Sequence, residues 1–173
     1  MENIKAGDLI LFKPGGDLLS RIISWGTQST YSHVAVCVSP EMSLAIEANT
    51  KGGVRAIDLR QITRKFDIYR IKEEYNFKLP AVISFLVKQL NNKYDYYGVI
   101  FLGFMKLLAL IGKPLKNRTN KWQKDRDYFC SELCYEAFYK GGGLDIVPNV
   151  DEADITSPGD ISKSPVVEKV GAK

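Results

Sequence analysis

Histidine is nearly absent from this sequence, because His33 is the one histidine among 173 residues. Any imidazole chemistry must therefore use His33, and no cluster of histidine ligands can form a metal site. Cysteine is also scarce. Three cysteines are too few and too odd in number for the disulfide framework of a small secreted domain. We therefore expect Cys37, Cys130 and Cys134 to be free thiols, and we expect no metal and no other cofactor.

Long hydrophobic runs are missing as well. The most apolar stretch, residues 99–111, contains Lys106 and is shorter than the roughly 20 residues that a membrane-spanning helix needs. The N-terminal residues lack the basic region and apolar stretch of a secretory signal. We therefore expect a cytoplasmic protein without a transmembrane span.

Charge is only mildly unbalanced, with a formal net charge of +4. Such a bias permits anionic partners but requires none. Six of the basic residues lie between positions 112 and 127 with Trp122 as the one aromatic residue among them, and no nucleic-acid recognition motif is present. We expect no nucleic-acid partner. An apolar segment followed by a basic loop leaves peripheral contact with an anionic membrane open, and a core helix followed by a solvated loop is the simpler alternative.

The chain has ordinary globular composition, with 45% hydrophobic and 25% charged residues. It contains no internal repeat or dividing linker, so we expect one α+β domain over residues 1–173. Hydrophobic periodicity predicts a mostly antiparallel sheet followed by helices. The expected strands are 7–12, 32–38, 44–48, 54–59 and 66–71, and the expected helices are 18–25, 79–90, 97–111 and 129–139. The tail reads as irregular structure or short edge strands.

His33 lies in the strand-like segment 32–38, where alternate residues face opposite sides. A hairpin centred on Pro40 pairs Val36 with Leu44 and places His33 directly opposite Glu47. Opposed residues have Cβ atoms about 4.5–5.5 Å apart, so the carboxylate can reach the imidazole. Glu47 would then orient and polarise His33 as the third member of a nucleophile, base and orienter set. The alternative is a buried pair that only satisfies two polar side chains.

Small residues accompany this pair in the same register. Ala35, Cys37 and Ala45 share its face, and small residues let a helix approach closely.

Among the cysteines, position along the chain favours Cys130 as the partner of His33. Cys130 lies near the start of a predicted helix, where backbone N–H groups and the helix dipole favour a thiolate. Cys37 is four residues along the strand from His33, roughly 13 Å away. Cys134 is one turn deeper in its helix. The alternative is that all three are small buried hydrophobic residues.

These residues carry a resemblance to a known family. The segments Gly7-Asp8-Leu9-Ile10, Tyr31-Ser32-His33-Val34, Ile46-Glu47-Ala48, Tyr94-Asp95 and Phe129-Cys130-Ser131-Glu132 stand in the order found in circularly permuted NlpC-type papain-like amidases. The chain most resembles their YiiX and YaeF group. The resemblance implies a permuted papain-like fold in which an antiparallel sheet packs against helices. It also implies Cys130 as nucleophile, His33 as general base and Glu47 as orienting residue.

The same resemblance suggests Tyr31 or Tyr128 as an oxyanion or substrate contact. It implies a cysteine hydrolase that cleaves an amide of a small peptide or cell-wall-related substrate through an acyl-enzyme. Two alternatives stay open. One is a lipid acyltransferase or thioesterase acting at a membrane surface, because relatives of the permuted fold include enzymes resembling lecithin:retinol acyltransferase. The other is a peptide- or lipid-binding module without turnover. The sequence leaves the oligomeric state open.

Overall fold

The computed structural model describes residues 4–15, 29–50, 52–94, 127–149 and 156–173. The predicted helices 18–25 and 97–111, and all but the last residue of the basic loop 112–127, lie outside these ranges. The side chains of Tyr94, Asp127 and Tyr128 lie outside them too.

The centre of the molecule is a six-stranded antiparallel sheet in the order β4-β3-β2-β1-β5-β8. The strands are β1 (Leu9–Phe12), β2 (His33–Ser39), β3 (Leu44–Asn49), β4 (Gly53–Asp58), β5 (Phe66–Ile71) and β8 (Val167–Ala172). The five strands expected from the sequence are confirmed to within one or two residues. β8 is the edge strand that the tail supplies.

Helices and a short pair of parallel strands complete the fold. They are η1 (Leu59–Gln61), α2 (Leu79–Lys88), β6 (Lys93–Tyr94), β7 (Asp127–Tyr128), α4 (Cys130–Glu136), η2 (Ala137–Gly142) and α5 (Pro158–Ser162). Pro80 occupies the first turn of α2, where its missing N–H costs no helical hydrogen bond. The helix predicted over 129–139 is α4 continued by the π-helical turn η2. Neither α5 nor the β6-β7 pair was expected from the sequence.

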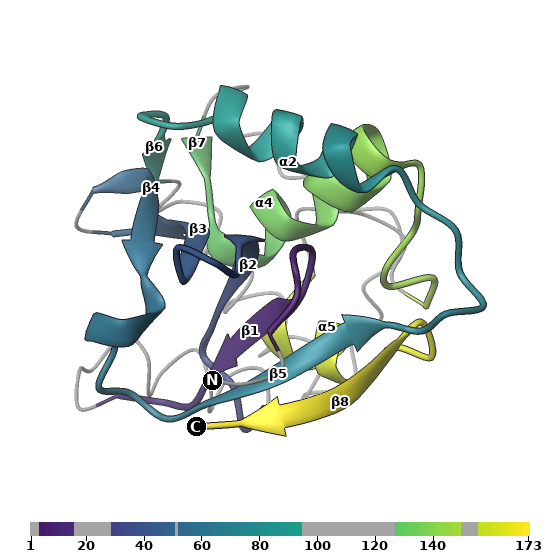
Figure 1. Ribbon diagram of the computed structural model, residues 1–173, viewed down its shortest axis with the longest axis horizontal. Coiled ribbons are helices and arrows are strands. Elements are labelled where there is room, and N and C mark those ends of the chain that lie inside the picture. The colour runs from purple at the N-terminus through teal and green to yellow at the C-terminus, as the bar shows by residue number, and fades with distance from the viewer. Residues whose placement is uncertain (1–3, 16–28, 51, 95–126, 150–155) are drawn as a thin grey trace, which may run out of the picture.

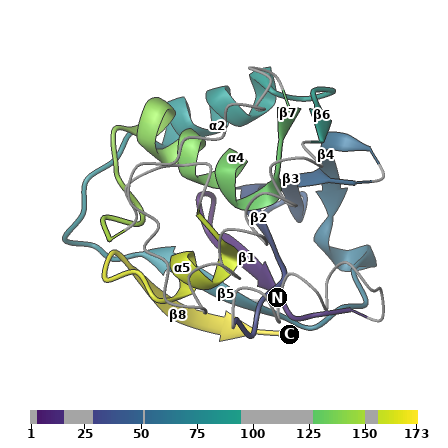
Figure 2. The ribbon, with the colours of Figure 1, turned by 180° about the vertical axis from the view of Figure 1, so that it is seen from behind.

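The helices lie in layers on one face of the sheet. α4 lies between α2 and the strands, as both ribbon views show (Figures 1 and 2). On this face Val34, Val36 and Ile46 pack with Leu133 and other residues of α4 in the main core. Burying one such side chain contributes roughly 1.5–3 kcal/mol. This packing fixes α4, and therefore its first residue, against the sheet.

The register of the β2-β3 hairpin differs from the predicted one by two residues. Val36 faces Ile46 rather than Leu44, and a bulge lies between Cys37 and Ser39. The turn is centred beyond Pro40, because Ser39 pairs with Leu44, and the bulge then changes the pairing by one residue. A slip of two keeps every side chain on its face. His33 and Glu47 therefore stay on one face, and they meet diagonally.

The small residues on that face do not receive a helix, and this expectation is also wrong. Ala35 and Ala45 pack with Phe12 and Phe66 in a second, smaller cluster on the opposite side from α4. His33 is the first residue of β2. Its imidazole can therefore meet the start of α4 around the end of the strand, without the helix crossing the small-residue face.

Candidate active site

The imidazole of His33 is hydrogen-bonded to a buried carboxylate. Its Nε2 lies 2.6 Å from Oε2 of Glu47, and the two side chains are 12% and 5% exposed. The Phe12 ring packs against the imidazole with ring centroids 5.5 Å apart. Because Glu47 occupies Nε2, the other ring nitrogen, Nδ1, remains for a second partner.

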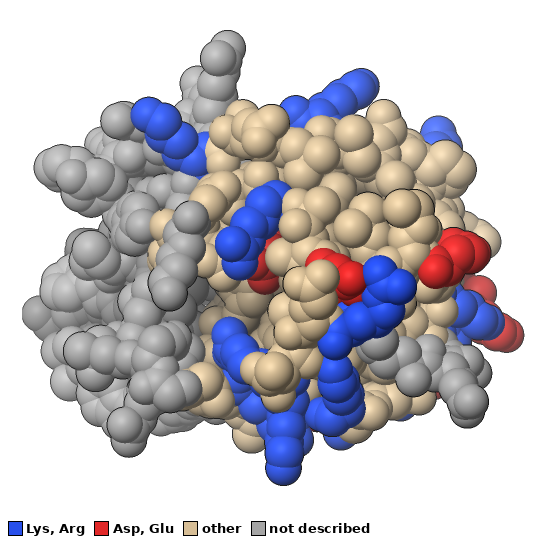
Figure 3. All heavy atoms as spheres, turned by 60° about the vertical axis from the view of Figure 1, so that its left-hand side comes forward, with Lys and Arg blue, Asp and Glu red and all other residues tan. Residues whose placement is uncertain are grey.

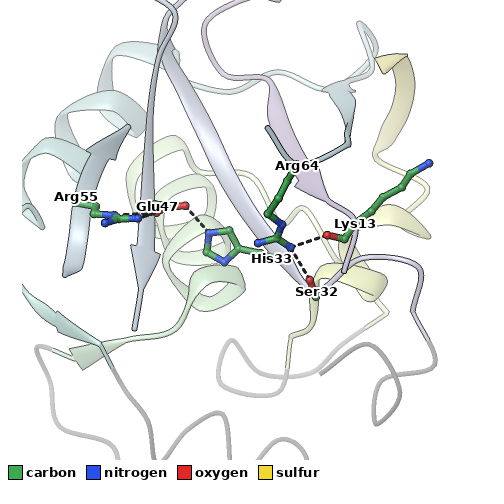
Figure 4. A network of polar contacts seen from close by, with 6 residues as sticks. All are labelled: Lys13, Ser32, His33, Glu47, Arg55 and Arg64. Atoms are coloured by element: carbon green, nitrogen blue, oxygen red, sulfur yellow. Dashed lines mark hydrogen bonds and ion pairs between the residues drawn. The ribbon is translucent and has the colours of Figure 1, made fainter. Parts of the chain in front are cut away.

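Arg55 holds the other oxygen of the same carboxylate. Its Nε and Nη2 donate to Oε1 of Glu47 at 2.9 and 2.8 Å (Figure 4). Arg55 lies directly opposite Glu47 in the β3-β4 ladder. The sequence carried a signal for this contact, because the turn at Gly52-Gly53 aligns the two positions and opposite charges favour cross-strand pairing. The prediction nevertheless missed Arg55.

Cys130 is the second partner of His33. It is the first residue of α4, is 4% exposed, and its thiol lies close enough to the imidazole for the two groups to shift each other's pKa. The backbone N–H groups of Val34 and Ser131 also donate to its sulfur. Next to it, the Ser131 hydroxyl donates to the carbonyl of Thr156 at 2.7 Å, which ties the start of α4 to the chain just before α5.

The charges of this cluster support one another. Burial raises the pKa of Cys130, but the charge and hydrogen bond of His33 and the two backbone N–H groups outweigh it, so this pKa is lowered. Burial likewise lowers the pKa of His33, and the contacts with Cys130 and Glu47 reverse this and raise it to about 9. The pKa of Glu47 is lowered because hydrogen bonds and charges from His33 and Arg55 exceed the effect of burial. A thiolate and an imidazolium are thereby favoured together.

The other two thiols have the opposite electrostatics. Burial raises the pKa of Cys134, and the charges of Cys130 and Glu47 add to the effect. Burial and the nearby Asp8 raise the pKa of Cys37 to about 11. All three cysteines are free and buried. Of the three, only Cys130 is favoured as a thiolate.

The two tyrosines expected near an oxyanion are placed differently. The Tyr31 hydroxyl donates to Oδ2 of Asp67 at 2.6 Å and lies 3.0 Å from the hydroxyl of Tyr69. Its proton is therefore committed to a carboxylate. Tyr128 lies in β7, two residues before Cys130. The structure thus brings Cys130, His33 and Glu47 together, with Tyr31 in a separate network.

A family model of permuted papain-like amidase enzymes, the YaeF/YiiX or C92 family, matches residues 3–99, more than half of the chain. The chain belongs to this family. It is therefore a cysteine hydrolase of the amidase and peptidase class with the α+β fold of that group. The matched residues include His33 and Glu47 but end before Cys130, so the assignment of the nucleophile rests on the geometry described above.

A solved structure supports the fold over nearly the whole length. The chain is similar to a protein from Escherichia coli O157:H7 described as the metalloprotein yiiX, with a TM-score of 0.60 and 19% identity over 98% of this chain and 97% of that one. No curated protein matches the sequence.

That relative is described as a metalloprotein. Within the described ranges of this chain, no group of three or more histidine, cysteine, aspartate or glutamate residues could hold a metal ion. In the cluster itself, both oxygens of Glu47 are already bonded, one to His33 and one to Arg55. These residues do not fit a metal site, and no step below uses one.

The segment that leaves membrane contact open, residues 99–126, lies outside the described ranges. Among the helices that the structure does describe, none has the length and hydrophobicity to cross a membrane.

Proposed function

We propose that this hydrolase cleaves an amide bond through Cys130, His33 and Glu47. The observation that carries the proposal is that the Cys130 thiol lies within interaction range of the His33 imidazole, whose Nε2 Glu47 holds at 2.6 Å. A nucleophile, a base and a group that orients the base are the three parts that such catalysis needs. Arg55 adds a fourth part, because it fixes the orienting carboxylate.

The reaction follows from these roles. The Cys130 thiolate attacks the amide carbonyl, and a C–S bond forms. His33 gives its proton to the leaving nitrogen as the C–N bond breaks, which releases the amine and leaves an acyl-enzyme. A water molecule then gives a proton to His33 while its oxygen bonds to the carbonyl carbon. The C–S bond breaks, the acid leaves, and the thiolate and imidazolium are restored.

The substrate class we propose is a small peptide or cell-wall-related amide. The family description supports amide cleavage. For the oxyanion, Tyr128 remains a candidate because of its place two residues before Cys130. Tyr31 is less suited, because its hydroxyl donates to Asp67. A lipid ester as substrate, or binding without turnover, are outcomes that the experiments below distinguish.

The test is the pH dependence of iodoacetamide alkylation at each cysteine, followed by mass spectrometry. Because the pKa of Cys130 is lowered, its alkylation should stay fast below the range of ordinary thiols, which titrate near 8.5, and should fall only as the pH drops through the lowered value. His33→Gln removes the imidazolium. At pH 6.5 we expect this variant to react at least about tenfold more slowly, because each unit by which the thiol pKa rises lowers the ionised fraction about tenfold below that pKa.

Cys37 and Cys134 are internal controls in the same digest. Burial raises both pKa values, so neither should be alkylated while the protein is folded. If Cys130 behaves as an ordinary thiol in the wild type, catalysis through Cys130 is contradicted. Binding without turnover is then the favoured function. If Cys130 reacts as expected, turnover of peptide amides, compared with lipid esters of the same acyl group, identifies the substrate class.

A further inference from the structure

Arg64 lies beside the imidazole, on the side away from Glu47 (Figure 4). Its guanidinium carbon lies 5.5 Å from the centre of the Phe12 ring, and that ring packs against His33 at 5.5 Å. The Phe12 ring thus packs against both the guanidinium and the imidazole. Stacking on an aromatic ring is a favourable position for a guanidinium.

Two hydrogen bonds fix the orientation of this guanidinium. Nη2 of Arg64 donates to the carbonyl of Lys13 at 2.6 Å and to the hydroxyl of Ser32, the residue before His33, at 2.9 Å. Both bonds use the same nitrogen. Nε is buried with no acceptor in the described part of the chain. Arg64 is therefore held in place while part of its donor capacity is unused.

Its charge is also uncompensated. The other arginines that the structure describes each pair with a carboxylate: Arg55 with Glu47, Arg60 with Asp58, and Arg70 with Asp8. For Arg64 no carboxylate lies within ion-pair distance among the described residues, although its side chain is half-buried. A partly desolvated cation without a counter-ion is costly, and such cost is usually offset where a ligand supplies the anion.

We propose that Arg64 binds a carboxylate of the substrate next to the scissile bond, so that the enzyme prefers amides with an acidic group there. This inference rests on the proposed function, because it places the anion relative to the Cys130 and His33 pair. On the face that carries β4, basic side chains lie on both sides of a hollow (Figure 3). The guanidinium suits this role because its planar fork of N–H donors hydrogen-bonds well with carboxylates.

Two alkylating reagents of nearly equal size provide the first test. Iodoacetate carries a carboxylate next to the reactive carbon, and iodoacetamide carries a neutral amide there. The measured quantity is the ratio of their rate constants at Cys130. We expect Arg64→Gln to lower the iodoacetate rate relative to the iodoacetamide rate by about fivefold, the scale of one ion pair.

Arg60→Gln is the matched control. It removes the same charge from a position where Arg60 already pairs with Asp58 and is largely exposed, and it should leave the ratio unchanged. An equal ratio in the Arg64 and Arg60 variants would overturn the anion site. So would an equal loss for both reagents in the Arg64 variant, since that shows a structural role alone.

A second test does not depend on a reactive thiol. In a Cys130→Ala background, the single histidine gives one imidazole Cε1–H signal in the proton NMR spectrum. We expect a saturable shift of this signal with N-acetylglycine, no comparable shift with N-acetylglycinamide, and loss of the difference in Arg64→Gln. Equal responses to acid and amide contradict the proposal. If Cys130 proves unreactive while this shift is seen, the catalytic proposal fails and the anion site stands.

Discussion

Two buried carboxylates on one sheet, Glu47 and Asp67, have similar surroundings but different partners. They are 4% and 2% exposed, and in each case hydrogen bonds to neighbouring groups lower the pKa against the effect of burial. Glu47 bonds to the imidazole of His33 and to Arg55. Asp67 accepts the hydroxyl of Tyr31 at 2.6 Å and pairs with Lys169 at 2.9 Å.

The difference lies in what the partner can do near neutral pH. An imidazole exchanges protons in this range and lies beside the Cys130 sulfur, so the charge of Glu47 stabilises an imidazolium that in turn favours the thiolate. A phenol keeps its proton there, and burial together with the Asp67 hydrogen bond raises the pKa of Tyr31 still further. A buried, hydrogen-bonded carboxylate therefore does not mark a site by itself. Its partner decides whether its charge is used for chemistry or for stability.

Neutralising each carboxylate in turn tests whether Glu47 alone controls the reactivity of Cys130. Glu47→Gln removes the charge that stabilises the imidazolium, so the pKa of His33 should fall and that of Cys130 should rise. A rise of one unit in the pKa of Cys130 slows its alkylation about tenfold at pH values below that pKa, and we expect at least this effect on the acidic limb of the profile. The measurement is the iodoacetamide rate at Cys130 over pH 5.5–9. Asp67→Asn is the matched control and should alter that rate by less than about twofold. Equal effects of the two substitutions would mean that Glu47 has no special link to the nucleophile.

The effect that we expect for Asp67 is on stability. Asp67→Asn leaves the Tyr31 hydroxyl and Lys169 without a charged acceptor. We expect a loss of about 1–3 kcal/mol in the free energy of unfolding at pH 7, measured by urea denaturation. Because the folded-state pKa of Asp67 is lowered, its stabilisation is present above the unfolded value near 3.9 and is lost as the pH falls through the folded value. The difference between wild type and variant should therefore shrink below about pH 4. A constant difference from pH 7 to pH 3 would assign the effect to packing.

The local pattern of the sequence predicted much of this arrangement. Alternation placed His33 and Glu47 on one face of two neighbouring strands, and that result survives the change of register because a two-residue shift preserves faces. Helical periodicity placed Cys130 near the start of a helix, where the structure has it. These features depend on spacing within a few residues, which a sequence displays directly.

Contacts between distant segments were not predictable in the same way. No local signal placed α4 on the valine face rather than on the face of Ala35, because both faces are apolar. The contact of Arg64 with Ser32 joins residues 32 positions apart, and it depends on how β5 returns beside β1. The partner of Tyr31 was missed for the same reason, since Asp67 lies 36 positions away. Arg55 was different, because its place opposite Glu47 follows from a short hairpin and could have been found.

Substitution of Arg55 tests the role of Glu47 indirectly and should give the smallest effect on Cys130. It binds the oxygen of Glu47 that His33 does not use, so we infer that it is a positioning residue that acts through the carboxylate. Arg55→Met should free that oxygen, lower the Cys130 alkylation rate at pH 6.5 by about threefold and move the acidic limb of its pH profile upward. The side chain is 43% exposed, and solvent screening keeps the effect well below that of removing Glu47.

The conservative variant separates this positioning role from a contribution to folding. Arg55→Lys keeps the charge but loses the bidentate contact. Compared with Arg55→Met, it should therefore recover part of the alkylation rate, and its pH profile should lie closer to that of the wild type. Arg60→Met removes a charge from the other end of the same hairpin and should leave the profile in place. A purely structural Arg55 would give a different result. Its substitution would lower the urea midpoint and leave the pH profile of Cys130 where it is, because the carboxylate would then hold the imidazole without help.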